Sequence, residues 1–436
     1  MTDLRDEVLR VARDLIRMDT SNAPARLLGR RPGNETAAAA YLRDYLTAAG
    51  VDCELVAREE HRANLVARLP GTGDAPSLAF VGHTDVVPVD PRDWTHPPFE
   101  GVVDDDGYLH GRGAVDMKNE VAARAVALAE LARSGFRPRG DLWFLAVADE
   151  EDGMADVGMR WLLESRPDIR PDVAINEGGG ELLALADGRT MATVGVGEKG
   201  TLPVCVTAVG EAGHASTPNV GNNAVPLLGE LLRRVGRGMP DPGSSPWLEA
   251  TLSALGVADV ESARALHPSL AELLPAMTGT TMAPTLLQGS TKRNVMPSRA
   301  SVELDCRILP GTTRADVEAT VRSRLGNGIT YELSWPEILI AGSASPPESG
   351  LMSAIEAFWA DRGGDVSVLP LLDSGFTDSV YLRAAAGTTA YGFSPYIHTP
   401  PEVLAAGYHN ANERVHVDDL LLSVEFHFDL ARRLLT

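Results

Sequence analysis

Cysteine, aromatic residues and positive charge are all scarce in this sequence. Its 436 residues include three cysteines, Cys53, Cys205 and Cys306, which lie far apart, so neither a disulfide framework nor a CxxC metal site is expected. Lysine and arginine number 39 against 60 aspartates and glutamates, which gives a formal charge of -21. An acidic chain is a poor partner for nucleic acid or an anionic membrane surface, and solubility is the simplest explanation of its charge.

Long apolar runs are also missing. No stretch of about 18 apolar residues occurs, so no membrane span is expected. The first residues, MTDLRDEVLRVARDL, carry charges throughout and lack the apolar core of a signal peptide, so we expect a cytoplasmic protein. Hydrophobic residues nevertheless make up 44% of the chain, as in an ordinary globular protein, and its length predicts two domains.

Strands alternate with helices at both ends of the chain. The predicted helices span about 3–17, 35–49, 119–133, 347–362, 378–386 and 417–435. The predicted strands span about 64–69, 77–81, 142–148, 172–176, 366–371 and 388–393. Several of these strands are continuously apolar, which is typical of strands buried on both faces. We therefore expect an α/β fold with a mostly parallel sheet covered by helices on both faces, formed by residues 1–197 and 340–436.

The middle of the chain has a different pattern. Residues 202–209 and 301–309 alternate apolar with polar or small residues, which is typical of an antiparallel sheet with one open face. Predicted helices at 224–235 and 313–325, and an extra segment at 236–283, accompany these strands. We expect residues 198–339 to form an inserted two-layer α+β domain.

Acidic residues and histidines follow several predicted strands or lie in loops between elements. They are His83 and Asp85 after SLAFVG, Asp116 in GRGAVDMK, Glu150 and Glu151 after LWFLAVAD, and Glu177 after DVAIN. Ligands of open α/β sheets gather at the carboxyl ends of the strands. A single His-x-Asp is weak evidence and an isolated Asp-Glu-Glu is usually a solvated loop, but all four groups in one chain favour a metal site.

The charges of these side chains support the same interpretation. Asp85, Asp116, Glu150, Glu151 and Glu177 would place five carboxylates in one pocket, where they cannot all stay ionised without compensation. A pair of bound divalent cations supplies that compensation. Imidazole and carboxylate ligands together suit zinc, with cobalt or manganese possible, whereas calcium and magnesium prefer oxygen ligands alone.

Eight motifs together resemble one known family. They are GHTDVVP (82–88), GRGAVDMK (111–118), DEE (149–151), NEGG (176–179), GHASTP (213–218), NVMP (294–297), DCRILPG (305–311) and YHNANERV (408–415). In this order they resemble the dinuclear zinc metallopeptidase family of aminoacylase, carboxypeptidase G and succinyl-diaminopimelate desuccinylase. The long 236–283 segment is most similar to its larger branch, which includes yeast carboxypeptidase S.

The resemblance implies a ligand set for two zinc ions. His83 and Glu177 would bind one ion, Glu151 and His409 would bind the other, and Asp116 would bridge both.

The resemblance also implies the residues that act beside the metals. Asp85 would accept a hydrogen bond from the far nitrogen of His83 and fix its tautomer. Glu150 would be the general base that takes a proton from the metal-held water and hands it to the leaving amine. The peptide bond between Asp116 and Met117 is expected to be cis, as it often is in the family.

The inserted domain carries further candidates by the same resemblance. His214 in GHASTP would help stabilise the oxyanion, often from the partner subunit, so a homodimer through the inserted domain is expected. Without the other motifs, His214 would more often be a capping or turn histidine. Arg307 and Asn294 of this domain, and Gly375 outside it, are expected to bind the substrate. Four histidines outside the matching motif positions are expected to have structural roles: His96, His110, His398 and His416.

Arg307 has an open alternative. Its guanidinium could clamp a substrate carboxylate bidentately, or it could form a salt bridge with Asp305 or Glu303. The resemblance favours the substrate role.

We therefore expect a metal-dependent hydrolase that cleaves an amide or peptide bond of an N-acyl amino acid or small peptide with a free carboxylate. Two alternatives stay open. A dinuclear zinc aminopeptidase would usually lack the equivalents of His214 and Arg307, which are present, and a metal-free scaffold should have lost Glu150 or a ligand. The G-x-S-x-G elbow of serine hydrolases and the HExxH zinc motif are absent from the sequence.

Overall fold

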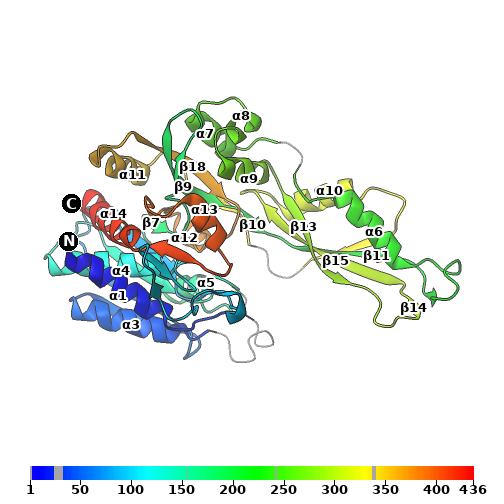
Figure 1. Cartoon of the computed structure of the whole chain (residues 1–436), viewed down its shortest axis with the longest axis horizontal. Helices are drawn as coiled ribbons and strands as arrows, with labels where there is room; N and C mark the ends of the chain where they lie inside the picture. Colours follow the sequence, from blue (N-terminus) through cyan, green and yellow to red (C-terminus); the bar gives the residue numbers. More distant parts are fainter. Residues whose placement is uncertain (1, 24–32, 154, 241–242, 336–339) are drawn as a thin grey trace. The chain divides into compact units, whose positions relative to one another are not determined.

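The computed structural model describes residues 2–23, 33–153, 155–240, 243–335 and 340–436 (Figure 1). The chain divides into two compact units. The first unit comprises Met1–Gly197, Ser345–Leu371 and Thr377–Thr436, and the second comprises Glu198–Ala344 and Leu372–Phe376. None of the described helices is long and apolar enough to cross a lipid bilayer.

A mixed sheet forms the centre of the first unit. Its strands follow the order β1 (Asp52–Ala57), β2 (Ala63–Leu69), β6 (Leu142–Val147), β3 (Leu78–His83), β7 (Val173–Asn176), β19 (Thr389–Gly392) and β9 (Thr190–Glu198). The four middle strands, β6, β3, β7 and β19, are parallel. On either side, β1, β2 and β9 run antiparallel to their neighbours, and β8 (Leu182–Ala184) and β18 (Val366–Asp373) also pair with β9.

Helices cover both faces of this sheet, as predicted. They are α1 (Thr2–Ile16), α3 (Glu35–Ala48), α4 (Lys118–Arg133), α5 (Met159–Ser165), α11 (Gly350–Asp361), α12 (Ser379–Ala386) and α14 (Val417–Leu435). On one face Val81 shares a core cluster with Leu162 of α5 and Leu382 of α12. On the other face Phe80 contacts His427 of α14, and α4 also packs against β3. Because adjacent residues of β3 are buried on opposite faces, the strand is apolar throughout.

The strands β4 (Val102–Val103), β5 (Tyr108–His110) and β20 (Arg414–His416) form a small sheet. Of these, β20 directly precedes α14 in the sequence and packs against it. The helix α13 (Pro401–Gly407) ends two residues before His409. A short 3-10 turn, Pro91–Asp93, completes the described elements of this unit.

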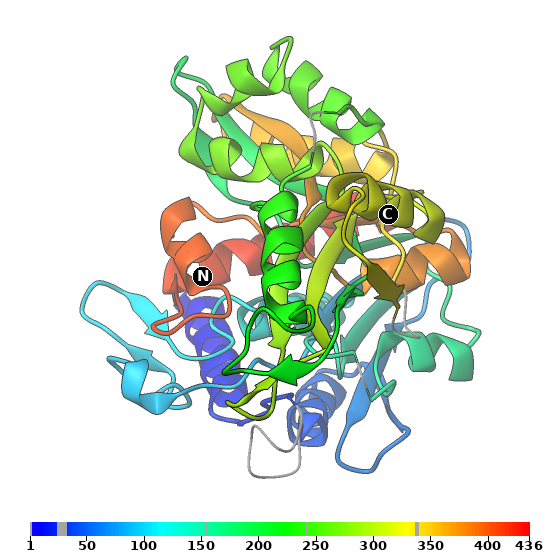
Figure 2. The ribbon, with the colours of Figure 1, turned by 90° about the vertical axis from the view of Figure 1, so that its right-hand side faces the viewer.

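The second unit has two layers. Its antiparallel sheet contains β10 (Gly200–Thr201), β11 (Val204–Val209), β13 (Thr281–Gln288), β15 (Arg299–Ile308) and β16 (Tyr331–Ser334). Alternate residues of β11 and β15 are buried under α6 (Ala224–Val235) and α10 (Arg314–Leu325), and Figure 2 shows α6 in green across these strands. The alternation explains the one-sided sheet. The other elements are β12 (Gly213–His214), α7 (Pro246–Leu255), α8 (Val260–Arg264), α9 (Pro268–Met277), β14 (Val295–Met296) and β17 (Ser343–Ala344).

Candidate metal centre

The first unit brings His83, Asp116 and Glu177 together at the carboxyl end of its parallel strands. His83 is the last residue of β3, Glu177 follows β7, and Asp116 lies in the loop before α4. Nε2 of His83 is 3.1 Å from Oδ1 of Asp116 and 3.4 Å from Oε2 of Glu177. One potential ligand atom from each side chain therefore faces a common point.

A second group shares Asp116. Nε2 of His409 lies 3.2 Å from Oδ2 of Asp116 and 3.0 Å from Oε2 of Glu151. Within each group the potential ligand atoms all lie within 4.8 Å of one another. The two carboxylate oxygens of Asp116 thus face different imidazoles, which is the arrangement that a carboxylate bridging two cations requires.

The backbone around Asp116 is held by Glu413, a buried residue of the YHNANERV motif. Its carboxylate oxygens accept the N–H groups of Val115 at 2.6 Å and Asp116 at 2.9 Å, and that of Gly113 at 3.0 Å. The same carboxylate pairs with Nη1 of Arg112 at 2.6 Å. The peptide bond between Asp116 and Met117 is cis, which confirms the prediction.

Asp85 contributes differently from the prediction. Nδ1 of His83 donates to the main-chain carbonyl of Asp85 at 2.9 Å, whereas the Asp85 carboxylate is 3.6 Å away. The carbonyl therefore uses Nδ1 as its donor and turns Nε2 toward Asp116 and Glu177. The carboxylate instead accepts the N–H groups of Glu150 at 3.3 Å and Glu151 at 3.1 Å. Asp85 thus positions the loop that carries both glutamates.

That loop is supported by a buried polar network. The side-chain amide of Asn22 donates to the carboxylates of Asp85 at 2.9 Å and Asp149 at 3.0 Å. The guanidinium of Arg62 forms ion pairs with Asp149 at 3.3 Å and with Glu35 at 2.5 Å. Asp149 adopts a left-handed conformation with φ 63. Such a conformation persists when surrounding contacts determine it, and these hydrogen bonds do so.

A buried arginine ties together the strands that carry the first group. Arg124 of α4 donates to the carbonyl of Val81, near the end of β3, and to that of Asn176 at the end of β7, the latter at 2.8 Å. Its charge is balanced by Glu120 at 2.6 Å. His83 and Glu177 are therefore anchored from the helix below them. Neither Arg124, Glu120 nor Glu413 was predicted, since each looks like an ordinary charged residue in the sequence.

Burial and like charges disturb the carboxyl groups of the site. Burial, and then the charge of Glu177, raise the pKa of Glu150 well above its usual range. Burial and the charge of Asp116 raise the pKa of Glu151 to about 7. Burial would also raise the pKa of Asp116, but hydrogen bonds from His409 and His83 outweigh it and lower that pKa. The buried Asp378 also has its pKa raised, by burial and by the charge of Glu177.

The donors fit divalent cations. Oε1 of Glu151 is buried and has no hydrogen-bond partner among the described residues, although a carboxylate oxygen in such a place ordinarily has one. The pKa of His409 is raised to about 10 by its hydrogen bonds to Asp116 and Glu151, so protonated imidazole compensates these carboxylates in the chain alone. Cations would do the same with imidazole and carboxylate ligands, a mixture that suits zinc.

The other predicted site residues belong to the second unit. His214 is exposed at the end of β12, with Nδ1 2.6 Å from the hydroxyl of Ser216. Arg307 pairs with Asp305 through two hydrogen bonds, of 2.8 and 3.1 Å, which is the salt bridge considered above. The main-chain carbonyl of the exposed Asn294 accepts the N–H of Ala215 at 3.2 Å. Gly375 donates its N–H to Asp373 at 2.8 Å.

Comparison with known proteins gives a consistent result. The model of peptidase family M20/M25/M40 matches residues 79–433. Aminoacylase-1 of Mus musculus is 29% identical over 403 residues, 89% of this chain and 88% of its own. Succinyl-diaminopimelate desuccinylase of Alkalilimnicola ehrlichii is 30% identical over 406 residues, which cover 90% of this chain and 92% of that protein. The crystal structure of an M20 family metallo-carboxypeptidase from Sulfolobus solfataricus shares the fold, with TM-score 0.71 at 18% identity over 98% of this chain and 99% of that one.

Proposed function

The chain belongs to peptidase family M20/M25/M40 and is a hydrolase of C–N bonds, and from this membership we propose that it uses two metal ions to cleave the amide bond of an N-acyl amino acid or small peptide with a free carboxylate. The observation that carries the proposal is the sharing of Asp116 between two His-carboxylate groups. The names of the aminoacylase and desuccinylase relatives support this substrate class.

The ligands follow from the two groups. His83 and Glu177 hold one ion, Glu151 and His409 hold the other, and Asp116 binds both. Three carboxylates then oppose the four positive charges of two divalent ions, which leaves a small positive excess. Bound ions of this kind supply a water of lowered pKa and polarise the scissile carbonyl. We propose zinc as the metal, with cobalt or manganese as substitutes.

Glu150 is the general base in this proposal. Its side chain is only 8% exposed, and Oε2 lies 3.9 Å from Nε2 of His83, close to the ligands without belonging to either group. The hydrogen bond from its N–H to Asp85 holds it in this place. Glu150 takes the proton of the attacking water and delivers it to the leaving nitrogen.

The second unit supplies substrate contacts in this proposal. Nδ1 of His214 is used by Ser216, so Nε2 is the nitrogen that donates to the oxyanion. Arg307 would bind the substrate carboxylate, exchanging part of its pairing with Asp305 for it. Asn294 and the turn at Gly375 would orient the substrate. Arg307→Lys keeps the positive charge but loses the bidentate geometry of the guanidinium, so it should raise KM more than it lowers kcat.

We also propose a homodimer formed through the second unit. Exposed large apolar side chains gather there, among them Val225 at 47%, Leu286 at 62% and Leu287 at 65%. Leu286 and Leu287 lie on β13, a strand that pairs with β15 on one side and is an edge of the described sheet. Exposed apolar edge strands are prone to pairing with another chain. The mass measured by light scattering should be that of a dimer for the wild type and that of a monomer for Leu287→Lys.

The catalytic proposal is tested by a hydrolysis screen. N-acetyl and N-succinyl amino acids and dipeptides are offered to the chain with added zinc, manganese or cobalt. With the substrate and metal that give the highest activity, Glu150→Gln should lower kcat at least about 100-fold, because the general base is lost. The amount of bound metal should stay unchanged, because the ligands remain. Asp152→Asn, an exposed carboxylate of the same loop, is the control and should keep wild-type activity. Full activity of Glu150→Gln would contradict the assignment of the base.

A further inference from the structure

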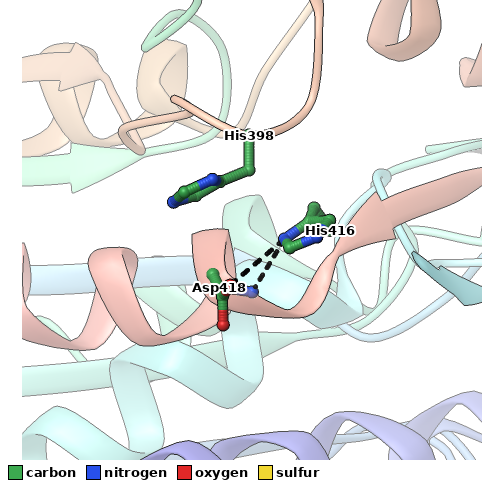
Figure 3. A group of neighbouring side chains, drawn as sticks. All are labelled: His398, His416 and Asp418. Atoms are coloured by element: carbon green, nitrogen blue, oxygen red, sulfur yellow. Dashed lines mark hydrogen bonds and ion pairs between the residues drawn. The ribbon is translucent and has the colours of Figure 1, made fainter. Parts of the chain in front are cut away.

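A third group of imidazole and carboxylate donors lies in the first unit, outside the candidate metal centre. Figure 3 shows His398 and His416 with Asp418 beside them. Each offers one ligand atom, and these atoms lie within 4.8 Å of one another. We propose that His398, His416 and Asp418 form a separate binding site for a divalent transition-metal ion, although the sequence predicts structural roles for both histidines.

The backbone that carries His398 is fixed to the start of α14 by a buried carboxylate. Asp419 is 1% exposed and accepts the N–H groups of His398 at 3.0 Å and Thr399 at 2.7 Å. The hydroxyl of Thr399 in turn accepts the N–H of His416 at 2.9 Å. The two histidines, which are 18 positions apart in the sequence, are therefore held next to each other before any ion binds. Their ring centroids are 5.1 Å apart and their planes are inclined by 29°.

The tautomer of His416 suits a metal ligand. His416 caps α14, and its Nδ1 accepts the N–H of Asp418 at 3.2 Å. A ring nitrogen that accepts a hydrogen bond carries a lone pair, so no proton must leave Nδ1 when a cation binds. The contact is at the long end of the hydrogen-bond range, and little stabilisation is lost when the nitrogen turns to an ion.

The two oxygens of Asp418 have different partners. Oδ1 accepts the guanidinium of Arg5 at 2.6 Å, whereas Oδ2 lies 3.7 Å from Nδ1 of His416. The ion pair with Arg5 holds the Asp418 carboxylate in place in the first turn of α14. Oδ2 therefore faces the histidine pair as an ionised donor, and its charge offsets the positive end of the helix dipole at this position.

The donors select the class of ion. Two imidazoles and one carboxylate suit zinc, nickel, copper or cobalt rather than calcium or magnesium. Ligand atoms about 2.1 Å from a tetrahedral ion stand about 3.4 Å apart, so a small rotation of the exposed His398 side chain closes the site. Water completes the coordination, because His398 is exposed and Asp418 is half-exposed. We expect this site to bind more weakly than the candidate metal centre, whose ligands include the buried Asp116 and His83.

The experiment counts metal ions on the full chain. Metal-free protein is dialysed against zinc buffered in the micromolar range, and the bound zinc is measured by mass spectrometry. His398→Ala and Asp418→Asn should each bind one equivalent fewer than wild type. His61→Ala is the matched control: His61 also lies 3.7 Å from a carboxylate, that of Glu59, but belongs to no three-donor group among the described residues, and this variant should lose nothing.

The difference between wild type and variants tests this site whatever number of ions the candidate metal centre holds. His398 is chosen because its side chain is exposed, so its removal leaves the fold unchanged, and circular dichroism checks this. The lost equivalent should also appear as a missing thermal stabilisation at excess zinc, since the ion joins the 397–399 loop to α14. Retention of full wild-type stoichiometry in His398→Ala would overturn the proposal.

Discussion

The buried carboxylate of Glu413 gives the most quantitative prediction. It is fully buried, pairs with Arg112 at 2.6 Å, and accepts three main-chain N–H groups of the 113–116 loop. The substitution Glu413→Ala removes the carboxylate and with it all four of these interactions. It leaves the Arg112 guanidinium, which is 3% exposed, without its countercharge, and it releases the backbone that places Asp116.

The expected loss of stability can be worked from these contacts. Removing one partner of a buried ion pair costs about 3–5 kcal/mol, because the other charge stays buried and uncompensated. Each main-chain N–H that loses its acceptor adds about 1–3 kcal/mol where it stays buried. The terms overlap, because the loop can move and admit water. We therefore expect the free energy of unfolding to fall by at least about 3 kcal/mol.

Urea unfolding followed by circular dichroism measures this quantity on metal-free protein. Glu230→Ala is the control, because Glu230 forms exposed ion pairs with Arg233 and Arg234, and it should cost less than about 1 kcal/mol. The double variant Arg112→Ala with Glu413→Ala should be more stable than Glu413→Ala alone, since no charge is left unpaired. A loss below about 1 kcal/mol for Glu413→Ala would show that Glu413 contributes no more than an exposed ion pair.

Three further outcomes are expected. Chelation of the metals should lower the melting temperature, because the clustered carboxylates then lack their countercharge, and an unchanged melting temperature would contradict the metal centre. Burial and the charge of Arg124 hold the pKa of His427 well below 6.5, so the unfolded chain takes up a proton that the folded chain does not. Stability should therefore fall by about 1.4 kcal/mol per unit as the pH drops below that value, and His427→Gln, compared by urea unfolding at several pH values, should lack this slope. His214→Ala should lose most activity and keep its metal, and mixing it with inactive Glu150→Ala should restore some turnover if the histidine acts across a dimer.

Much of the first unit could be predicted because its signals are local. The apolar runs of β3, β6 and β7 and the periodicity of α4 and α14 lie within single windows of sequence, and the last helix begins at Val417 as predicted. The antiparallel strands β1 and β9 were not predicted as strands. Both alternate or mix apolar with polar and small residues, and their place is decided by pairing with distant segments.

Some features of the candidate metal centre could likewise be predicted from the sequence, and others could not. Imidazole and carboxylate groups at strand ends and in loops indicated His83, Asp116, Glu151 and Glu177. His409 followed only from the resemblance of YHNANERV to the family motif. The role of the Asp85 carbonyl could not be predicted, since backbone atoms leave no trace in a list of residues. Glu413 and Arg124 were missed because a charged residue in a helix or loop is usually solvated, and only burial shows that it acts as an anchor.

Residue types and their spacing were sufficient to indicate an α/β chain with imidazoles and carboxylates at strand ends, and the family that those motifs resemble. Which of these groups meet depends on the folded chain. It turned the two oxygens of Asp116 toward different histidines, and it brought His398 to His416 through the buried Asp419. The physical reason is that residue types fix what a group can bind, whereas hydrogen bonds between segments far apart in the chain fix where it points.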